Sequence, residues 1–120
     1  MTYDERIKQA LLAVSPDVWH FKAMPEPESR ERPYIVWAEY GAGDTVFGSG
    51  RKRAGSVAGT VDLFTRNRDG EPLVKAVQEA LDGVCAWRLL SVQYEEDTGL
   101  LHYEWGWEIE DGEIRDQNGG

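Results

Sequence analysis

The sequence is short of the residues on which redox, metal and nucleophilic chemistry most often depends. Its 120 residues include one cysteine, Cys85, and two histidines, His20 and His102. A single cysteine cannot form an internal disulfide, and its apolar neighbours Val84 and Ala86 favour a small buried side chain in a reducing cytoplasm. Neither histidine has another metal-binding side chain at a spacing typical of zinc ligands. We therefore expect no metal site and no cofactor.

Long apolar runs, phosphate-binding loops and excess positive charge are also missing. No stretch of about 18 apolar residues occurs, so we expect no membrane-spanning segment. Gly48–Arg51 lacks the strand-to-helix context and the downstream lysine of a phosphate loop, and no serine lies in a recognisable nucleophile motif. With 22 acidic against 13 basic residues, the formal charge is −9. This sign disfavours autonomous binding to nucleic acids or to anionic lipids.

The residues that are present predict one folded domain. Hydrophobic residues make up 41% and aromatic residues 11% of the chain, which excludes a mainly disordered protein. A chain of this length buries about two-thirds of the surface that it exposes when unfolded. We place a single α+β domain at residues 1–110 and a disordered polar tail at 111–120.

Residues 56–83 predict a strand, a tight loop and a helix, and form the centre of this domain. Apolar residues alternate along 56–66, as in a half-buried strand. The apolar period becomes helical over 73–84, with Pro72 tolerated in the first turn and Gly83 placed to end the helix. Both elements have an apolar face to bury, so we expect them to pack against the same core.

The N-terminal third predicts a second helix and an extended connection. Thr2 and Glu5 match a capping box, and the helix that follows ends before Pro16. The prolines and charges of residues 17–33 indicate a surface loop. Within it, Trp19 and Phe21 form either a short strand or a plug over the core.

A long glycine-rich arm is predicted between two antiparallel strands, 33–40 and 56–66, because the intervening stretch is too long for a tight hairpin. One interpretation of its charged residues is a solvated loop tip. The other is an element that contacts an acidic surface on a second copy of the chain. The arm residues assigned to that contact are an apolar pair and a basic triplet: Val46, Phe47, Arg51, Lys52 and Arg53.

The C-terminal strands show the clearest alternation. Residues 87–94 predict a strand, 95–99 a turn, and 101–109 a strand with aromatic residues on one face and acidic residues on the other. The sequence thus predicts an α+β fold with an antiparallel sheet of about four to five strands, packed on one face by two helices. The acidic residues expected to face outward are Glu95, Glu96, Asp97, Glu104, Glu108 and Glu110.

Paired carboxylates allow an enzymatic alternative. Glu104 and Glu108, with Glu95 and Asp97 nearby, are candidates for the acid and base of a small hydrolase. Such a pair needs one buried member with a raised pKa, whereas these residues fall on the polar side of a strand, so a solvated acidic face is favoured. His102 lies on the same side, where the carboxylates would raise its pKa, although the simplest interpretation is an exposed strand histidine.

The order of these elements resembles that of the tail terminator or tail completion proteins of long-tailed bacteriophages and prophages. The resemblance covers nearly all of residues 2–110. It rests on an N-terminal helix, PYIVWAEYG at 33–41, the glycine-rich arm, VDLFTR at 61–66, LVKAVQEAL at 73–81, and the aromatic strands of 87–109. It implies a non-enzymatic virion subunit that forms a hexameric ring at the head-proximal end of the tail, stops tube polymerisation and docks to the neck.

The resemblance also implies the partners. These are other copies of the chain, the tail tube protein and the neck or connector protein, while DNA passes through the ring without specific binding. Carboxylates would suit such a passage because affinity for phosphates comes from lysine and arginine. The alternatives are a head-tail joining or neck adaptor protein, the carboxylate-dependent hydrolase, and a monomeric adaptor that binds a protein through an exposed sheet edge.

Overall fold

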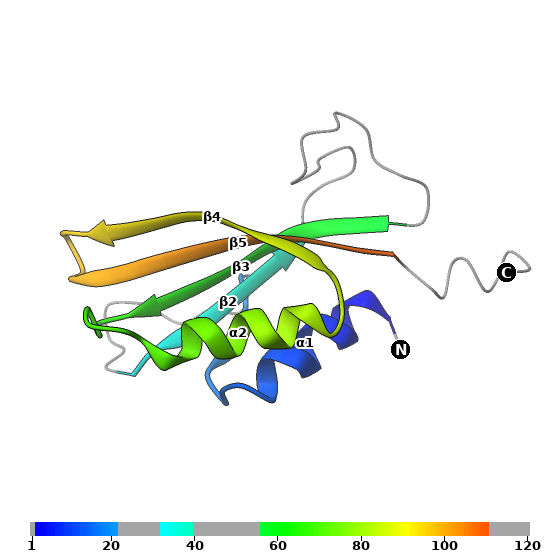
Figure 1. Cartoon of the computed structure of the whole chain (residues 1–120), viewed down its shortest axis with the longest axis horizontal. Helices are drawn as coiled ribbons and strands as arrows, with labels where there is room; N and C mark the ends of the chain where they lie inside the picture. The colour runs from blue at the N-terminus through cyan, green and yellow to red at the C-terminus, as the bar shows by residue number, and fades with distance from the viewer. Residues whose placement is uncertain (1, 22–31, 40–55, 111–120) are drawn as a thin grey trace, which may run out of the picture.

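The computed structural model of the protein describes residues 2–21, 32–39 and 56–110 (Figure 1). The arm residues Val46, Phe47 and Arg51–Arg53 and the tail at 111–120 lie outside the described residues. The predicted α+β class is confirmed, with two helices on a five-stranded sheet. The elements are α1 (Tyr3–Leu12), β1 (Val18–His20), β2 (Tyr34–Glu39), β3 (Ser56–Thr65), α2 (Pro72–Asp82), β4 (Ala86–Glu95) and β5 (Leu100–Glu110).

The strands form one sheet in the order β1-β2-β3-β5-β4. The pairs β2–β3 and β4–β5 are antiparallel, as the sequence predicts, and β5 also pairs antiparallel with β3. Strand β5 therefore lies between β3 and β4, and β4 forms one edge of the sheet. A register shift between Leu89 and Ser91 interrupts the β4–β5 pairing.

The interpretation of residues 17–33 as a loop is wrong at its start. Val18–His20 forms β1, which pairs in parallel with β2 and makes the sheet mixed. Of the two alternatives for this region, the short strand is correct for Trp19, whereas Phe21 follows the strand and is exposed.

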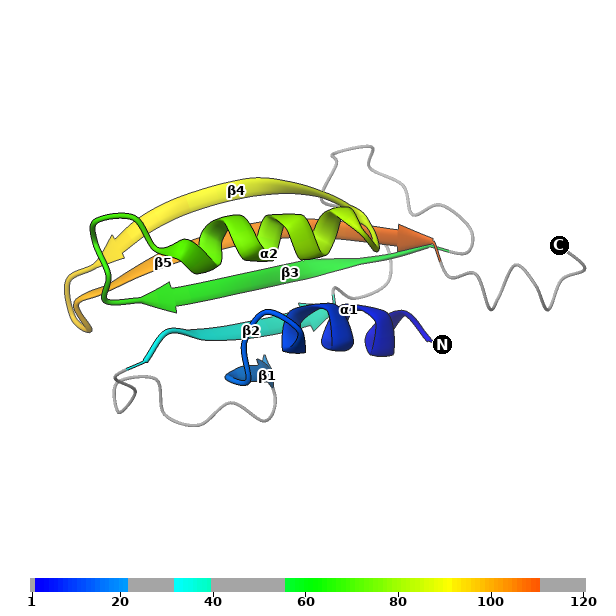
Figure 2. The ribbon, with the colours of Figure 1, turned by 60° about the horizontal axis from the view of Figure 1, so that its bottom comes forward.

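Both helices cover the same face of the sheet (Figure 2). The amide of Glu5 donates a hydrogen bond to the Thr2 hydroxyl (3.3 Å), which caps α1 as predicted. In α2, Pro72 occupies the first turn and Gly83 is the C-cap, also as predicted. Neither of these helices is long and apolar enough to cross a membrane.

The main core lies between the helices and the sheet. Gly59 is required where β2, β3 and β5 meet, because a β-carbon there would overlap the Ala38 carbonyl oxygen and the Trp107 ring. Trp105 and Trp107 are fully buried, so the aromatic face of the last strand packs under the helices, as predicted. The buried residues of this core are Ile7, Leu11, Ile35, Trp37, Val61, Leu63, Val77, Leu81, Trp105, Trp107 and Ile109.

The face of the sheet without helices is not uniformly polar. One end of it carries a smaller apolar cluster of Tyr34, Val36 and Leu100, with Trp19 and Phe64 packed against them. The Phe64 ring stacks on Tyr34 (centroids 4.9 Å apart) and on the His102 ring (4.2 Å). The aromatic cluster on this face therefore directly adjoins His102.

Candidate functional site

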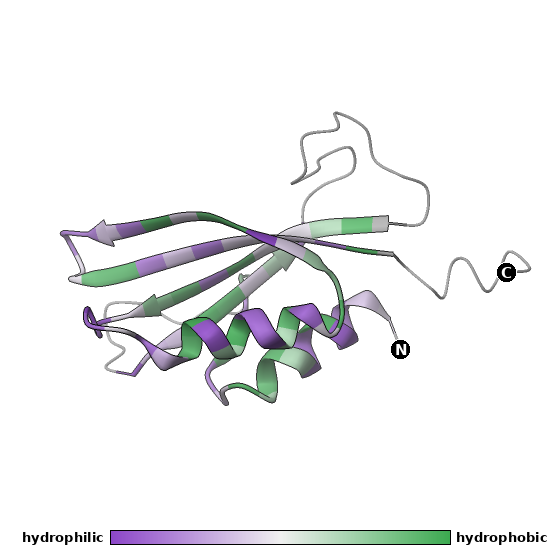
Figure 3. Ribbon diagram, viewed as in Figure 1, coloured by the Kyte–Doolittle hydropathy of each residue, from purple (hydrophilic) through white to green (hydrophobic). Residues whose placement is uncertain are grey.

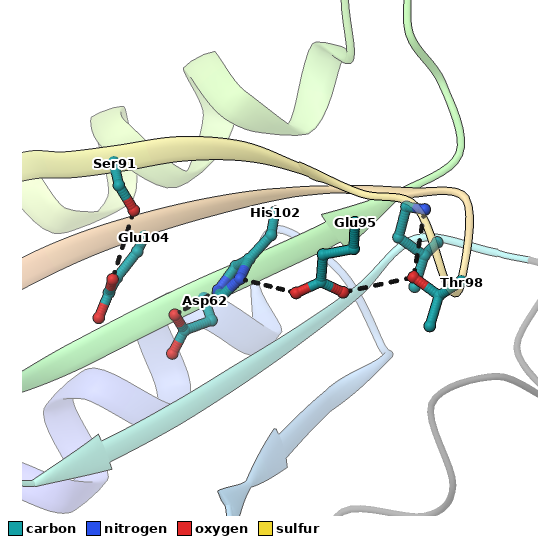
Figure 4. Close-up of polar contacts among 7 residues, drawn as sticks. Asp62, Ser91, Glu95, Thr98, His102 and Glu104 are labelled. Carbon is teal, nitrogen blue, oxygen red and sulfur yellow. Dashed lines mark hydrogen bonds and ion pairs between the residues drawn. The ribbon is translucent and has the colours of Figure 1, made fainter.

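Three neighbouring strands bring acidic and polar side chains together on the face without helices (Figure 4). Asp62 on β3 lies opposite Glu104 on β5, and Glu104 lies opposite Ser91 on β4. His102 is two positions from Glu104 and therefore points to the same side. We call Asp62, Ser91, Glu95, His102 and Glu104 the open-face cluster.

His102 is the centre of the open-face cluster. Its Nε2 lies 2.7 Å from Asp62 Oδ1, and its Nδ1 lies 3.3 Å from Glu95 Oε2. A histidine can donate from both ring nitrogens only as the imidazolium. The geometry therefore favours a charged ring that joins β3, β5 and the end of β4.

The pKa of His102 reflects opposing effects. Burial of the ring disfavours the charged form and lowers the pKa, but the hydrogen bond to Asp62 and the charges of Asp62, Glu95 and Glu104 outweigh burial. The pKa is therefore raised above its ordinary value of 6.5, in the direction that the sequence indicated. The expectation of an exposed histidine is wrong, because only 20% of the side chain is accessible.

The β4–β5 turn is fixed to the same cluster. The Thr98 hydroxyl donates to Glu95 Oε1 (3.3 Å), and the Thr98 carbonyl accepts from Arg66 (2.9 Å). Gly99 adopts φ +75°, a conformation that suits glycine. The β4–β5 turn is therefore held by its own hydrogen bonds and also by the contact between Glu95 and His102.

The open-face cluster lacks the geometry of a serine nucleophile. Ser91 Oγ donates to Glu104 Oε1 (3.4 Å) rather than to His102, and both nitrogens of His102 already face carboxylates. A general base needs a free ring nitrogen within hydrogen-bonding distance of the nucleophile. His102 and its two carboxylate partners instead form ion pairs that connect β5 to β3 and to β4.

The candidate hydrolase pair is also poorly spaced. Glu104 and Glu108 lie four residues apart on one strand, which separates their Cα atoms by about 13 Å. Glycosidase carboxyl groups lie about 5 to 9.5 Å apart. Glu104 instead shares its surroundings with Asp62 and His102, while Glu108 lies opposite Ala58 and Ala86.

The other predicted acidic residues are dispersed. Glu96 and Asp97 are exposed in the β4–β5 turn, and the side chain of Glu110 lies outside the described part of the chain. The structure therefore brings Glu95 and Glu104 together, and it adds Asp62, which sequence reasoning missed. The signal for Asp62 was its place on the polar side of the strand at 56–66. The pairing partner of that strand could not be read from the pattern.

A second group of polar residues lines a pocket of about 360 Å³ beside α1, on the other side of the sheet. His20 Nε2 lies 2.6 Å from Glu39 Oε1, and the His20 ring meets the Trp37 ring edge-on at 4.7 Å. The lining residues are Asp4, Glu5, Lys8, His20, Trp37 and Glu39. Across residues 2–21, 32–39 and 56–110, no three side chains of His, Cys, Asp or Glu are arranged to hold a metal ion.

Cys85 is not part of either group. Its thiol contacts the Leu81 carbonyl (3.5 Å), and burial, with the nearby Asp82 charge, raises its pKa to about 12. A thiol with this pKa is a poor nucleophile near neutral pH.

Comparison with known proteins leaves the family of the chain open, since no protein-family model matches it and no curated protein matches it.

Proposed function

We propose that the chain is a structural subunit of a long-tailed phage virion, a tail terminator or tail completion protein that forms a hexameric ring. The ring would cap the tail tube at the tail-neck junction and join the tube to the neck or connector. The protein would be made in the host cytoplasm and would have no catalytic role. The observation that carries the proposal is the element order, which resembles that of this family: an N-terminal helix, a strand, a long glycine-rich arm, a strand, a helix and two aromatic strands.

The open-face cluster supports a structural role. Its histidine is engaged by two carboxylates and its serine by a third, so these groups hold strands together. This face and its turn carry more carboxylates than cations. Glu104 and Glu108 lie on β5 and Glu96 and Asp97 in the adjoining turn, whereas Arg88 lies on the same face opposite Gly106. A face of this charge turned toward the lumen would let DNA pass without adhering.

The test uses the cognate tail tube protein and the purified chain. Mass photometry of the chain, alone and mixed with tubes, should show a ring or assembly on the tubes. Electron micrographs should show a density at one end of each tube, with tube length limited by the chain. A strict monomer that neither binds tube ends nor changes tube length would overturn the proposal.

A head-tail joining or neck adaptor protein is the second candidate, since the same face would suit any DNA conduit. Mixing the chain separately with tubes and with connector particles distinguishes the two functions. Binding to connectors without binding to tube ends would favour the neck adaptor.

A further inference from the structure

Strand β4 is a long edge strand with an unpaired outer side. It spans Ala86–Glu95 and pairs only with β5 among the described strands, whereas β1, at the other edge of the sheet, spans Val18–His20. Every second residue of an edge strand presents its backbone N–H and C=O groups outward, and these groups can pair with an added strand. Soluble proteins usually shorten such edges or place charges on them. Strand β4 is not protected in this way between residues 89 and 94, which include no charged side chain.

Strand β4 carries an exposed apolar stripe of Leu89, Val92 and Tyr94. Their side chains are 44%, 49% and 46% exposed. They lie opposite Trp105, Tyr103 and Leu101 and so belong to the helix-covered face of the sheet. Figure 1 shows β4 at one edge of the sheet, and Figure 3 shows hydrophobic and hydrophilic residues in turn along it.

Both ends of this edge are anchored. Near the start of β4, Trp87 Nε1 donates to Asp82 of α2 (2.6 Å). At its end, Glu95 binds His102, and the Arg68 guanidinium lies 4.7 Å from the centre of the Tyr94 ring. The apolar stripe is therefore held in an ordered position although α2 does not cover it.

Charge indicates what would cover this edge. Beyond the stripe, the β4–β5 turn presents the exposed Glu96 and Asp97, so a complementary segment needs apolar residues followed by basic ones. Residues 40–55 contain both, because Val46-Phe47 precedes the one run of three basic residues in the sequence, Arg51 to Arg53. Phe47 and Arg51 are four positions apart, as are Val92 and Glu96. An extended segment aligned parallel to β4 would place Phe47 beside Val92 and direct Arg51 toward the acidic β4–β5 turn.

We propose that the outer edge of β4 binds residues 40–55 of a second copy of the chain as an added strand. The segment begins after Glu39 and ends before Ser56, whereas the stripe continues to the β4–β5 turn, at the opposite end of the sheet. Contact between opposite ends of two copies is head-to-tail, and such contacts close into a ring when the rotation allows. This inference rests on the proposed ring-forming function and names the contact that forms the ring.

The first experiment is binding of a synthetic peptide of residues 40–55 to the full-length protein, followed by amide chemical shifts. The shifts should concentrate on residues 89–97, and Val92→Lys should weaken binding at least tenfold. Leu12→Lys is the matched control, because Leu12 is 43% exposed on α1, away from β4. A peptide with alanine at positions 51–53 should also bind at least tenfold more weakly. Absence of binding, or shifts elsewhere, would overturn the inference.

The second experiment distinguishes this inference from the proposed function. Val92→Lys should abolish ring formation by mass photometry while leaving the far-ultraviolet circular dichroism spectrum unchanged, and Leu12→Lys should preserve the ring. A ring that persists in Val92→Lys would refute the β4 contact and leave the proposed function standing. A wild-type chain that never assembles, even on tubes, would refute the proposed function, whereas the peptide experiment would still report on the edge.

The third experiment determines whether the contact joins two copies. In a Cys85→Ala background, a Phe47→Cys chain is mixed with a Val92→Cys chain under mild oxidation. A disulfide-linked pair containing one chain of each kind is expected. A chain carrying both cysteines that cross-links only within itself would overturn the inference, because the segment would then lie on β4 of its own copy.

Discussion

Replacement of His102 by glutamine should destabilise the protein in a way that depends on pH. Glutamine keeps a neutral donor on β5 but removes the charge that lies between Asp62 and Glu95. Hydrogen bonds to charged groups contribute about 1.5–3 kcal/mol, and the His102 side chain is only 20% exposed. We expect a loss of about 2 kcal/mol in the free energy of unfolding at pH 6. This corresponds to a decrease of about 8 °C in the melting temperature of a domain of this size.

The sign of the pH dependence follows from the direction of the shift. The pKa of His102 is raised in the folded state, while an unfolded histidine titrates near 6.5. The stabilisation is therefore fully present below about pH 6.5 and is lost as the pH rises through the raised folded pKa. Above the raised folded pKa the wild-type ring is neutral, so His102→Gln should cost much less there than at pH 6.

Urea denaturation of both proteins at several pH values between 6 and 9 measures this difference directly. An NMR titration of the His102 ring, assigned by its loss in His102→Gln, measures the folded pKa. Asp62→Asn should lower that pKa, because the hydrogen bond and the charge of Asp62 both raise it. A loss of stability that is the same below and above the measured folded pKa would refute the role of charge and leave only packing of the ring on Phe64.

Three further predictions concern stability and reactivity. Gly59→Ala should cost about 3 kcal/mol in urea denaturation, because the new methyl group overlaps the Ala38 carbonyl and the Trp107 ring. Gly83→Ala is its control and should be neutral or stabilising, since the nearest atom would be 3.5 Å away; equal costs at the two sites would contradict the overlap. Thr65→Val should cost about 2 kcal/mol, because it removes the 2.6 Å hydrogen bond to the buried Glu71 carboxylate, whereas Thr65→Ser should restore most of the loss. Cys85 should react with a thiol reagent at pH 8 at least a hundredfold more slowly in the folded protein than in urea, because its pKa is about 12; equal rates would show that the thiol is not shielded.

The elements predicted from sequence are those with a long repeating pattern. Strands β3 and β5 each show period-two alternation over ten or more residues, and α2 has an apolar period between a proline and a glycine. Such patterns arise because one face of each element is buried in the core. Strand β1 spans only Val18–His20, too short for any period, and it forms because β2 offers a partner. Local sequence could therefore indicate a strand there only as one of two alternatives.

The candidate site was only partly predictable because its contacts join distant residues. Asp62 and His102 are 40 positions apart, and they meet only because β5 pairs with β3 as well as with β4. The alternation of each strand placed both side chains on polar faces, but it could not assign the strand order. The exposure of Leu89, Val92 and Tyr94 was hidden for the same reason, since apolar residues on a strand indicate a face toward the core without showing which strands the helices cover.

The open-face cluster and the β4 edge are connected through Glu95. This residue ends β4, and its carboxylate binds His102 on one oxygen and Thr98 on the other. Loss of the imidazolium charge would break the link that runs from Glu95 at the end of β4 through His102 to Asp62 on β3. The part of the edge that carries Val92 and Tyr94 would then become looser. If the edge binds a second copy, His102→Gln should therefore weaken the peptide of residues 40–55 although His102 lies on the opposite face from the apolar stripe. Peptide affinity that falls at pH 6 but equals that of the wild type above the measured folded pKa of His102 would demonstrate this connection. Affinity unchanged at both pH values would show that the two features act independently.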